Sequence, residues 1–451
     1  MGKYFGTDGI RGLSNTPPMD VETALKVGMA AGAYFRNGSH KHRVIIGKDT
    51  RLSSYMIENA LTAGFISMGM EVFLVGPMPT PAVAVITRSM RADVGVMISA
   101  SHNPYQDNGI KLFRPNGLKL SDEAEAEIEK LIDSDLNSHT SEPSKLGRAK
   151  RIDDAAGRYI EYVKQTFPKR KNLEGLKIAL DCSNGAAYKI APIVFWELGA
   201  DVISISTEPN GFNINDNCGS THPELISQKV IETGADIGIS LDGDSDRLIV
   251  CDEKGKIIDG DQIMAAIAEN WNSRNRLSKR GIVTTVMSNM GLEEFLNSQG
   301  LKLERTKVGD RHVIQKMQSE GYNLGGEQSG HIIFNDFTTT GDGILAALQV
   351  LAALVDSQKP ANEVLNVFDP YPQILKNIRY NKNKICPLEN DNIKDSINQL
   401  NNELGTKGRI VVRKSGTEPL IRIMVEGKES GLIEAIPDKI ADEINLLNIS
   451  A

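Results

Sequence analysis

The chain has 451 residues, of which 40% are hydrophobic and 24% charged, and its formal net charge is −7. This composition is typical of a globular protein with an ample core, and the length suggests about three domains. The acidic balance argues against binding to bulk nucleic acid or to anionic membranes, so an anionic ligand would need a local basic site.

The N-terminal segment MGKYFGTDGIRG is polar and glycine-rich, so it has no signal-peptide pattern. No apolar run approaches the ~20 residues that span a bilayer. The four cysteines are far apart in the sequence and form no CxxC pair. We therefore expect reduced thiols in a cytoplasmic protein.

Three imperfect copies of one pattern follow one another along the chain. A short apolar run opens each copy, at 44–47, 178–180 and 282–285, and an amphipathic helical stretch, a glycine and a second strand follow. Glycine just past a helix suits the left-handed conformation that ends many helices. The alternation of helices and strands with short joints predicts three related α/β domains with mixed, largely parallel sheets.

The chain from about residue 368 has a different pattern. PLENDNIKDSINQLNNEL is predicted to be helical, and RIVVRKSGTEPLIRIMVEG reads as two strands around a polar loop. This part is predicted to be a C-terminal α+β domain. The stretches 135–150 and 366–374 are the best linker candidates, and the expected domains are 1–150, 151–252, 253–367 and 368–451.

Each of the three copies ends in a strand followed by an unusual polar loop: SASHNP (99–104), DGDSDR (242–247) and GEQSGH (326–331). In open α/β sheets, ligands gather outside the carboxyl ends of the strands. The three loops are therefore expected to converge on one site. The alternative is that the repeat records duplication alone and that only one loop is functional.

The second loop places Asp242, Asp244 and Asp246 at alternate positions, which share a face on an extended chain. Unit charges a few ångströms apart repel by roughly 4 kcal/mol per pair at an effective dielectric near 20. Either the loop is an acidic turn splayed into water, or a cation lies among the carboxylates. An EF-hand is excluded because Arg247 occupies the position of the sharp turn and the flanks look like strands. An octahedral Mg²⁺ site fits better, with Arg247 as a phosphate clamp.

In the first loop, Ser101 lies among small and turn-forming residues, so we expect an exposed hydroxyl. The GxSxG elbow of hydrolases is absent. His102 is adjacent, and neighbouring side chains rarely form a nucleophile–base pair. Activation of the serine would therefore come from a metal and from cationic neighbours, with Lys111 ten residues further on.

The remaining loops offer groups for a sugar and for a phosphate. Glu327, Gln328, Ser329 and His331 suit sugar hydroxyls, although a plain polar turn explains them equally well. The RKSGTEPLIR loop, at 413–422, combines cations, hydroxyls and a glycine, which is a recipe for binding a phosphate monoester. The alternative interpretation of this loop is a solvated basic hairpin tip. Arg11 in FGTDGIRG adds one more cation.

Taken together, five motifs resemble the α-D-phosphohexomutase superfamily, in this order and over essentially the whole chain: FGTDGIRG, SASHNP, DGDSDR, GEQSGH and RKSGTEPLIR. The resemblance implies four domains around a central cleft, with one active-site loop from each. It implies that Ser101 is a phosphoserine, that Asp242, Asp244 and Asp246 bind Mg²⁺ together with an oxygen of that phosphoserine, and that Lys111 is the general acid or base. His102, His331 and Arg11 would support the reacting phosphate beside Arg247. Sugar hydroxyls would be held by Glu327 and Ser329, and the non-reacting phosphate by Arg413, Ser415, Gly416, Thr417 and Arg422.

The activity implied by this resemblance is the interconversion of glucosamine 6-phosphate and glucosamine 1-phosphate through a 1,6-bisphosphate, which would feed the synthesis of UDP-N-acetylglucosamine and cell-wall precursors. The bisphosphate or another phosphate donor would prime Ser101. Gln328 and FGTDGIRG are similar to the enzymes that act on glucosamine. The alternatives are a mannose or glucose phosphate mutase, a serine- and metal-dependent sugar phosphatase, and a non-catalytic sensor of sugar phosphates. The expected partner is a small sugar phosphate, and binding to nucleic acid or to a membrane is not expected. Whether the protein forms a homodimer is left open.

Overall fold

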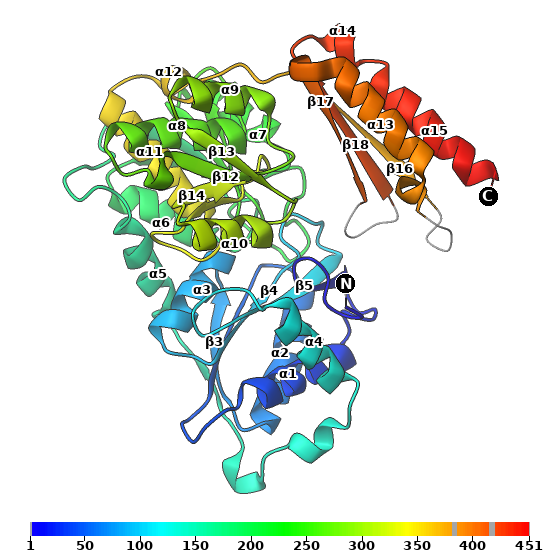
Figure 1. The fold of residues 1–451 in the computed structure, drawn as a ribbon. Coiled ribbons are helices and arrows are strands. Elements are labelled where there is room, and N and C mark those ends of the chain that lie inside the picture. Colours follow the sequence, from blue (N-terminus) through cyan, green and yellow to red (C-terminus); the bar gives the residue numbers. More distant parts are fainter. Residues whose placement is uncertain (1, 381–385, 415–419, 451) are drawn as a thin grey trace.

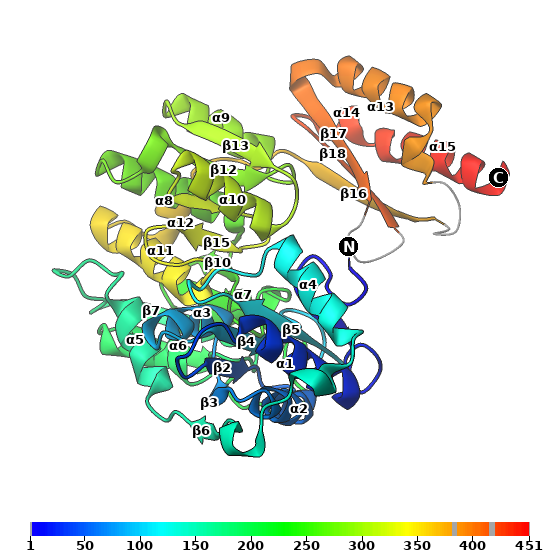
Figure 2. The same ribbon diagram turned by 60° about the horizontal axis from the view of Figure 1, so that its bottom comes forward.

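The computed structural model describes residues 2–380, 386–414 and 420–450, the last four of them by their backbone only. Ser415, Gly416 and Thr417, predicted to bind phosphate, lie outside the described residues. Figures 1 and 2 show three α/β units packed together and a C-terminal unit that stands apart from them. None of the helices within the described ranges is long and apolar enough to cross a membrane.

The first sheet has six strands in the order β1-β5-β4-β2-β3-β6, with β1 antiparallel to β5, β5 antiparallel to β4 and the rest parallel. Their bounds are Ile10–Leu13, Asp107–Phe113, Val94–Ile98, Arg43–Lys48, Glu71–Pro77 and Ala149–Arg151. Alternate residues of the central strands enter different core clusters, because helices cover both faces of the sheet. One face packs on α1 (Val21–Phe35), α2 (Ser53–Ser67) and α4 (Asp122–Ile132), and the other packs on α3 (Thr80–Ser89).

The second and third sheets repeat this plan. The second has the order β11-β10-β9-β7-β8, with bounds Ile257–Ile258, Leu248–Asp252, Ile237–Leu241, Lys177–Asp181 and Asp201–Ile205. Its helices are α5 (Ala155–Lys164), α6 (Ile190–Glu197) and α7 (Glu224–Thr233). The third has the order β13-β12-β14-β15, with bounds Lys302–Thr306, Gly281–Thr285, Leu324–Gly326 and Ile332–Phe334. Its helices are α8 (Gly260–Ser273), α9 (Met290–Ser298), α10 (Asp310–Glu320), α11 (Gly343–Ser357) and α12 (Ala361–Leu365).

The predicted threefold repeat is confirmed in its elements. β2, β7 and β12 open the copies, and β3, β8 and β13 pair parallel to them. Gly69, Gly199 and Gly300, which follow the first helix of each copy, all have positive φ, at 81°, 101° and 66°. An L side chain would be strained there, which explains the glycine at the same place in each copy.

The C-terminal domain is an antiparallel sheet of β16 (Gln373–Arg379), β18 (Leu420–Gly427) and β17 (Gly408–Lys414), in that order. Helices α13 (Asp391–Leu404), α14 (Ser430–Ile433) and α15 (Ile436–Ser450) complete the predicted α+β domain. Its hydrophobic core is separate, whereas one continuous core extends through the other three domains. The prediction of a linker at 135–150 was wrong in part, because this stretch holds two short 3₁₀-helices and ends in β6, which pairs with β3.

Candidate active site

Ser101 lies in the turn that follows β4, and it is buried, with 1% of its surface exposed. The expectation of an exposed hydroxyl was wrong, because the loop after β9 packs over it. The Oγ atom donates a hydrogen bond of 2.6 Å to Oδ2 of Asp242, 141 residues further along the chain. Ser101 also has a positive φ of 53°, an uncommon conformation for a residue with a side chain.

The conformation of the Ser101 loop is fixed by Arg51, which the sequence analysis missed. Arg51 is fully buried, and its Nε donates to Asp49 at 2.8 Å. The rest of its guanidinium donates to backbone carbonyls of the loop, including those of Ser101 at 2.9 Å and Asn103 at 2.8 Å. A planar donor with this many fixed partners holds the strained turn in place.

The aspartate loop connects β9 to β10, so its flanks are strands, as predicted. Asp242, Asp244 and Asp246 are all buried, and each offers a carboxylate oxygen within 4.8 Å of the others. A side chain on Gly243 would come within 2.6 Å of the Ser101 carbonyl oxygen. Glycine at this position therefore allows the two loops to approach so closely.

The surroundings shift the pKa values of Asp242 and Asp246 in opposite directions. Burial raises the pKa of Asp242 well above its usual range, and the carboxylates of Asp246 and Asp244 raise it further. Burial acts in the same direction on Asp246, but the Lys111 ammonium and His331 outweigh it and hold the pKa of that carboxyl well below its usual range. The surroundings thus disfavour the charged form of Asp242 and favour that of Asp246.

Lys111 lies among three carboxylates. Its Nζ is 2.8 Å from Asp244, 3.3 Å from Asp8 and 3.5 Å from Asp246. Burial disfavours the ammonium, but these carboxylates outweigh it and raise the pKa of Lys111 above its usual value. Thr80, at the first position of α3, donates to Asp244 at 2.6 Å and completes this side of the cluster.

The cluster fits a divalent cation. Oδ1 of Asp244 and Oδ1 of Asp246 are buried and accept no hydrogen bond of 3.5 Å or less within the described residues, and the second has His331 Nδ1 at 3.6 Å. Buried carboxylate oxygens that lack a donor carry a desolvation cost, which a cation would offset. An all-oxygen donor set suits Mg²⁺ in particular.

A chain of contacts between titratable side chains joins the third domain to this cluster, and Nε2 of His331 also accepts the backbone N–H of Gly341 at 3.1 Å. Nδ1 of His331 is 3.6 Å from Oδ1 of Asp246, and Nε2 is 3.4 Å from Oδ2 of Asp310. Lys119 then bridges Asp310, at 2.7 Å, to Asp8. Asp8, Lys119 and Asp310 were not predicted from the sequence. No local pattern marks them, because Asp8 and Lys119 are 111 residues apart and Lys119 meets Asp310 across a domain boundary.

The predicted cations and His102 surround the same cluster. Arg11 pairs with Asp8, and Arg247 donates its backbone N–H to Asp242 at 3.2 Å. His102 has its Nδ1 3.4 Å from Ser101 Oγ, while burial and the nearby Arg247 and Arg11 lower its pKa to about 3. His102 is therefore uncharged near neutral pH.

The GEQSGH loop lies beside the cluster and partly faces solvent. Glu327 accepts a hydrogen bond of 3.1 Å from the backbone N–H of Gly309, and Gln328 donates to Asp259 at 3.0 Å. Ser329 is exposed at the tip of the loop. A carboxylate at the edge of the cluster and an exposed hydroxyl beside it are accessible to a sugar.

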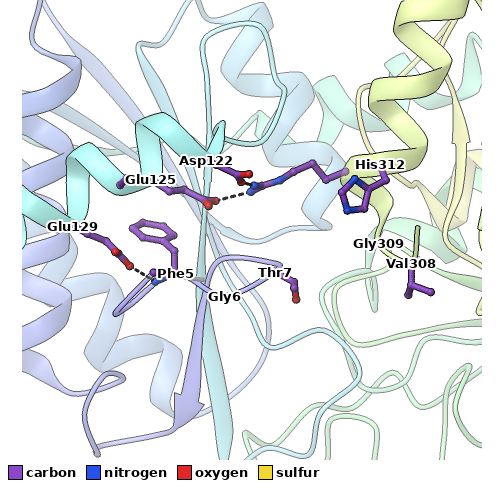
Figure 3. A pocket seen from close by; sticks show the side chains of 12 residues that line it. Phe5, Gly6, Thr7, Asp122, Glu125, Glu129, Val308, Gly309 and His312 are labelled. Carbon is purple, nitrogen blue, oxygen red and sulfur yellow. Dashed lines mark hydrogen bonds and ion pairs between the residues drawn. The ribbon is translucent and has the colours of Figure 1, made fainter. Parts of the chain in front are cut away.

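A cavity of about 470 Å³ lies between the N-terminal segment, α4 and the start of α10 (Figure 3). Glu129 accepts the backbone N–H groups of Lys3, Tyr4 and Phe5, so it fixes the N-terminal wall. On the other wall, Arg311 donates to Glu125 at 2.8 Å. The cavity adjoins the site, because Gly309 in its lining is the residue that donates to Glu327.

Of the predicted phosphate loop, Arg413 and Arg422 are described. They are paired across β17 and β18, so both side chains lie on the same face of the C-terminal sheet. Burial and Arg422 lower the pKa of Arg413, whereas Glu327 acts in the opposite direction. Arg413 thus lies within electrostatic range of Glu327 in the third domain.

Comparison with known proteins gives consistent matches along the chain. Four models of the phosphoglucomutase/phosphomannomutase family match in order: alpha/beta/alpha domain I at residues 2–139, domain II at 157–255, domain III at 259–371 and the C-terminal domain at 375–443. Phosphoglucosamine mutase of Parvibaculum lavamentivorans is 61% identical over 439 residues, 97% of this chain and 98% of the relative. That of Sphingopyxis alaskensis is 62% identical over 444 residues, 98% and 99% of the two chains.

Two solved structures have the same fold at low identity. A phosphoglucomutase/phosphomannomutase family protein from Burkholderia thailandensis has a TM-score of 0.82 at 24% identity, covering 98% of this chain and 97% of its own. Aspergillus fumigatus N-acetylphosphoglucosamine mutase, in complex with GlcNAc-6P and magnesium, has a TM-score of 0.68 at 18% identity, covering 99% and 96%. The four family models and the close relatives show that the chain belongs to the phosphoglucomutase/phosphomannomutase family and, within it, to the phosphoglucosamine mutases.

Proposed function

We propose that the chain interconverts glucosamine 6-phosphate and glucosamine 1-phosphate, with Ser101 as the carrier of the transferred phosphoryl group. The observation that carries this proposal is the 2.6 Å hydrogen bond from Ser101 to Asp242 within a buried cluster of three aspartates. Relatives about 60% identical over nearly the whole chain bear the name of this activity. The enzyme is thus an isomerase that transfers phosphate within its substrate.

Asp242, Asp244 and Asp246 would hold Mg²⁺ together with an oxygen on Ser101. When bound, Mg²⁺ would neutralise the carboxylates and stabilise the charge on the transferring phosphoryl group. A phosphoserine adds roughly −1.5 to −2 charge, so the positive charges of Arg247 and Arg11 support its binding here.

In the first half of the reaction, the phosphoryl group moves from Ser101 to the O1 oxygen of glucosamine 6-phosphate. The Ser101 O–P bond breaks, the O1–P bond forms, the O1 hydroxyl loses its proton, and the Ser101 oxygen gains one. Lys111 is the candidate general acid and base: its ammonium would give a proton to the Ser101 oxygen and take up the one that O1 loses, so the step balances. Despite burial, its pKa is raised by Asp244, Asp8 and Asp246, which disfavours donation, and a cation on the aspartate cluster would offset that rise. Asp242 then accepts the hydrogen bond of the free hydroxyl.

The second half repeats this chemistry in reverse on the other end of the sugar. The 1,6-bisphosphate turns round, its 6-phosphate passes to Ser101, and glucosamine 1-phosphate leaves. His331 and Arg247 would contact the reacting phosphate, and Glu327 and Ser329 the sugar hydroxyls. Arg413 and Arg422, with Ser415, Gly416 and Thr417, would grip the other phosphate, and the separate core of the C-terminal domain supports a movement that releases it.

A phosphoserine enzyme needs priming, which we assign to glucosamine 1,6-bisphosphate or another phosphate donor. We place the reaction in the cytoplasm, where its product would supply UDP-N-acetylglucosamine and peptidoglycan precursors. The four cysteines are buried and unpaired, which supports a reducing compartment.

The decisive variant is Ser101→Ala, with Ser134→Ala, an exposed serine, as its control. Ser101→Ala should lose mutase turnover and the phosphate adduct seen by intact mass, and it should still bind glucosamine 6-phosphate in calorimetry. Turnover at the wild-type rate would remove Ser101 from this role.

Inorganic phosphate as the main product of the wild-type protein would indicate a phosphatase instead. Comparing kcat/KM for the 6-phosphates of glucosamine, glucose and mannose measures the sugar preference.

A further inference from the structure

The N-terminal edge of the first sheet carries a cluster of two histidines and an aspartate. His40 and His42 come just before β2, and Asp93 comes just before β4. These strands are parallel, with Val44 opposite Val94, so the chain segments that enter them meet at one edge. Ser101 follows the opposite, carboxyl end of β4, so this cluster is separate from the mutase site.

The three side chains present their ligand atoms to one another. Oδ1 of Asp93 is 2.7 Å from Nε2 of His40 and 3.3 Å from Nδ1 of His42, and all three ligand atoms lie within 4.8 Å of one another. The side chain of His42 is 7% exposed and that of Asp93 14%, whereas that of His40 is 59% exposed. The cluster is therefore buried on one side and open to solvent on the other.

The cluster is anchored by the backbone. Oδ2 of Asp93 accepts the backbone N–H of Arg43 at 2.7 Å, and the N–H of Asp93 donates to the Arg43 carbonyl at 2.9 Å. This fixes the second carboxylate oxygen, as outer hydrogen bonds do for metal-binding carboxylates. Lys41, between the two histidines in the sequence, pairs with Glu71 at 3.5 Å, which offsets its positive charge.

We propose that His40, His42 and Asp93 bind a divalent transition metal of the Zn²⁺ class, with water as a fourth ligand. Imidazole nitrogen and carboxylate oxygen are ordinary zinc ligands, at about 2.0–2.2 Å. Ligand atoms of a tetrahedral site with such bonds are about 3.4 Å apart. The His42 contact already has this spacing, and the exposed His40 ring can move outward by the roughly 0.7 Å that the shorter contact requires. The metal would link the two strand entrances and stabilise the first domain.

A hydrogen-bonded His–Asp group without metal accounts for the same contacts, and a zinc titration separates the two interpretations. The full-length protein is titrated with ZnCl₂ against a chromophoric chelator, with Mg²⁺ in excess to occupy the aspartate cluster. We expect the wild type to bind zinc at least about tenfold more tightly than His40→Ala, because one of three protein ligands is lost. Zinc should also raise the Tm of the wild type and not that of His40→Ala.

His139→Ala replaces an exposed histidine on another surface segment, so it should bind zinc as the wild type does. The mutase activity of His40→Ala in Mg²⁺ should be unchanged, which shows that the variant is folded. His40→Gln keeps the polar character of the side chain and should lose zinc to the same extent. Equal zinc affinity in the wild type and both His40 variants, or no zinc uptake by the wild type, would overturn the proposal.

Discussion

Replacing Asp242 by Asn tests whether the aspartate cluster is built for a divalent cation. Unit charges no more than 4.8 Å apart, as the carboxylate oxygens of this cluster are, repel by at least about 3.5 kcal/mol at an effective dielectric of 20. Asn keeps the shape of the side chain and can still accept the Ser101 hydroxyl, but it removes one charge from two of the three pairs. Burial and this repulsion together raise the pKa of Asp242 well above its usual range. In EDTA we therefore expect Asp242→Asn to be at least as stable as the wild type.

Mg²⁺ should reverse this order of stability, so that the wild type becomes more stable than Asp242→Asn. A cation at 100 times its Kd stabilises the folded state by about 2.7 kcal/mol, which raises Tm by several degrees. The wild type should show this rise, and Asp242→Asn, which has lost a ligand, should show much less of it. Thermal unfolding followed by circular dichroism, in EDTA and in saturating Mg²⁺, measures all four states.

The control for this experiment is Asp216→Asn, which removes an exposed aspartate from the same domain. Its response to Mg²⁺ should equal that of the wild type. The reasoning fails if Mg²⁺ raises the Tm of Asp242→Asn as much as that of the wild type. It also fails if the variant is clearly less stable than the wild type in EDTA, since repulsion would then not dominate the cluster.

Three further measurements test other parts of the structure. Lys119→Met leaves the largely buried Asp310 without its 2.7 Å partner and should cost about 3 kcal/mol of unfolding free energy. Lys119→Met/Asp310→Asn should recover most of this loss, and simply additive losses in denaturant unfolding would contradict a coupled pair. Burial raises the pKa of Asp342 to about 6, so between about pH 4 and 6 the folded state holds a proton that the unfolded state has released, and stability falls as the pH rises through this window. Asp342→Asn should flatten that fall in a series of Tm measurements, and an unchanged pH profile would show that Asp342 titrates normally. Arg422→Gln should raise the KM for the sugar phosphate more than it lowers kcat, because it removes binding common to the ground and transition states; an unchanged KM would mean that other residues hold the phosphate.

The sequence by itself determined the order of the domains and the chemistry of the loops. The apolar runs and helical stretches are local patterns, so they predicted the strands, helices and end glycines of all three copies. The spacing of Asp242, Asp244 and Asp246 predicted a carboxylate cluster, because alternate residues of an extended chain share a face.

The tertiary structure alone decided how these loops are held and how much water reaches them. Ser101 is buried because Gly243 lets a loop from the second domain pack against its carbonyl, and nothing in the SASHNP sequence reveals that cover. Lys119 meets Asp310 across 191 residues of chain. Such pairs depend on how whole domains dock, and each partner, taken locally, has the sequence pattern of an ordinary surface charge.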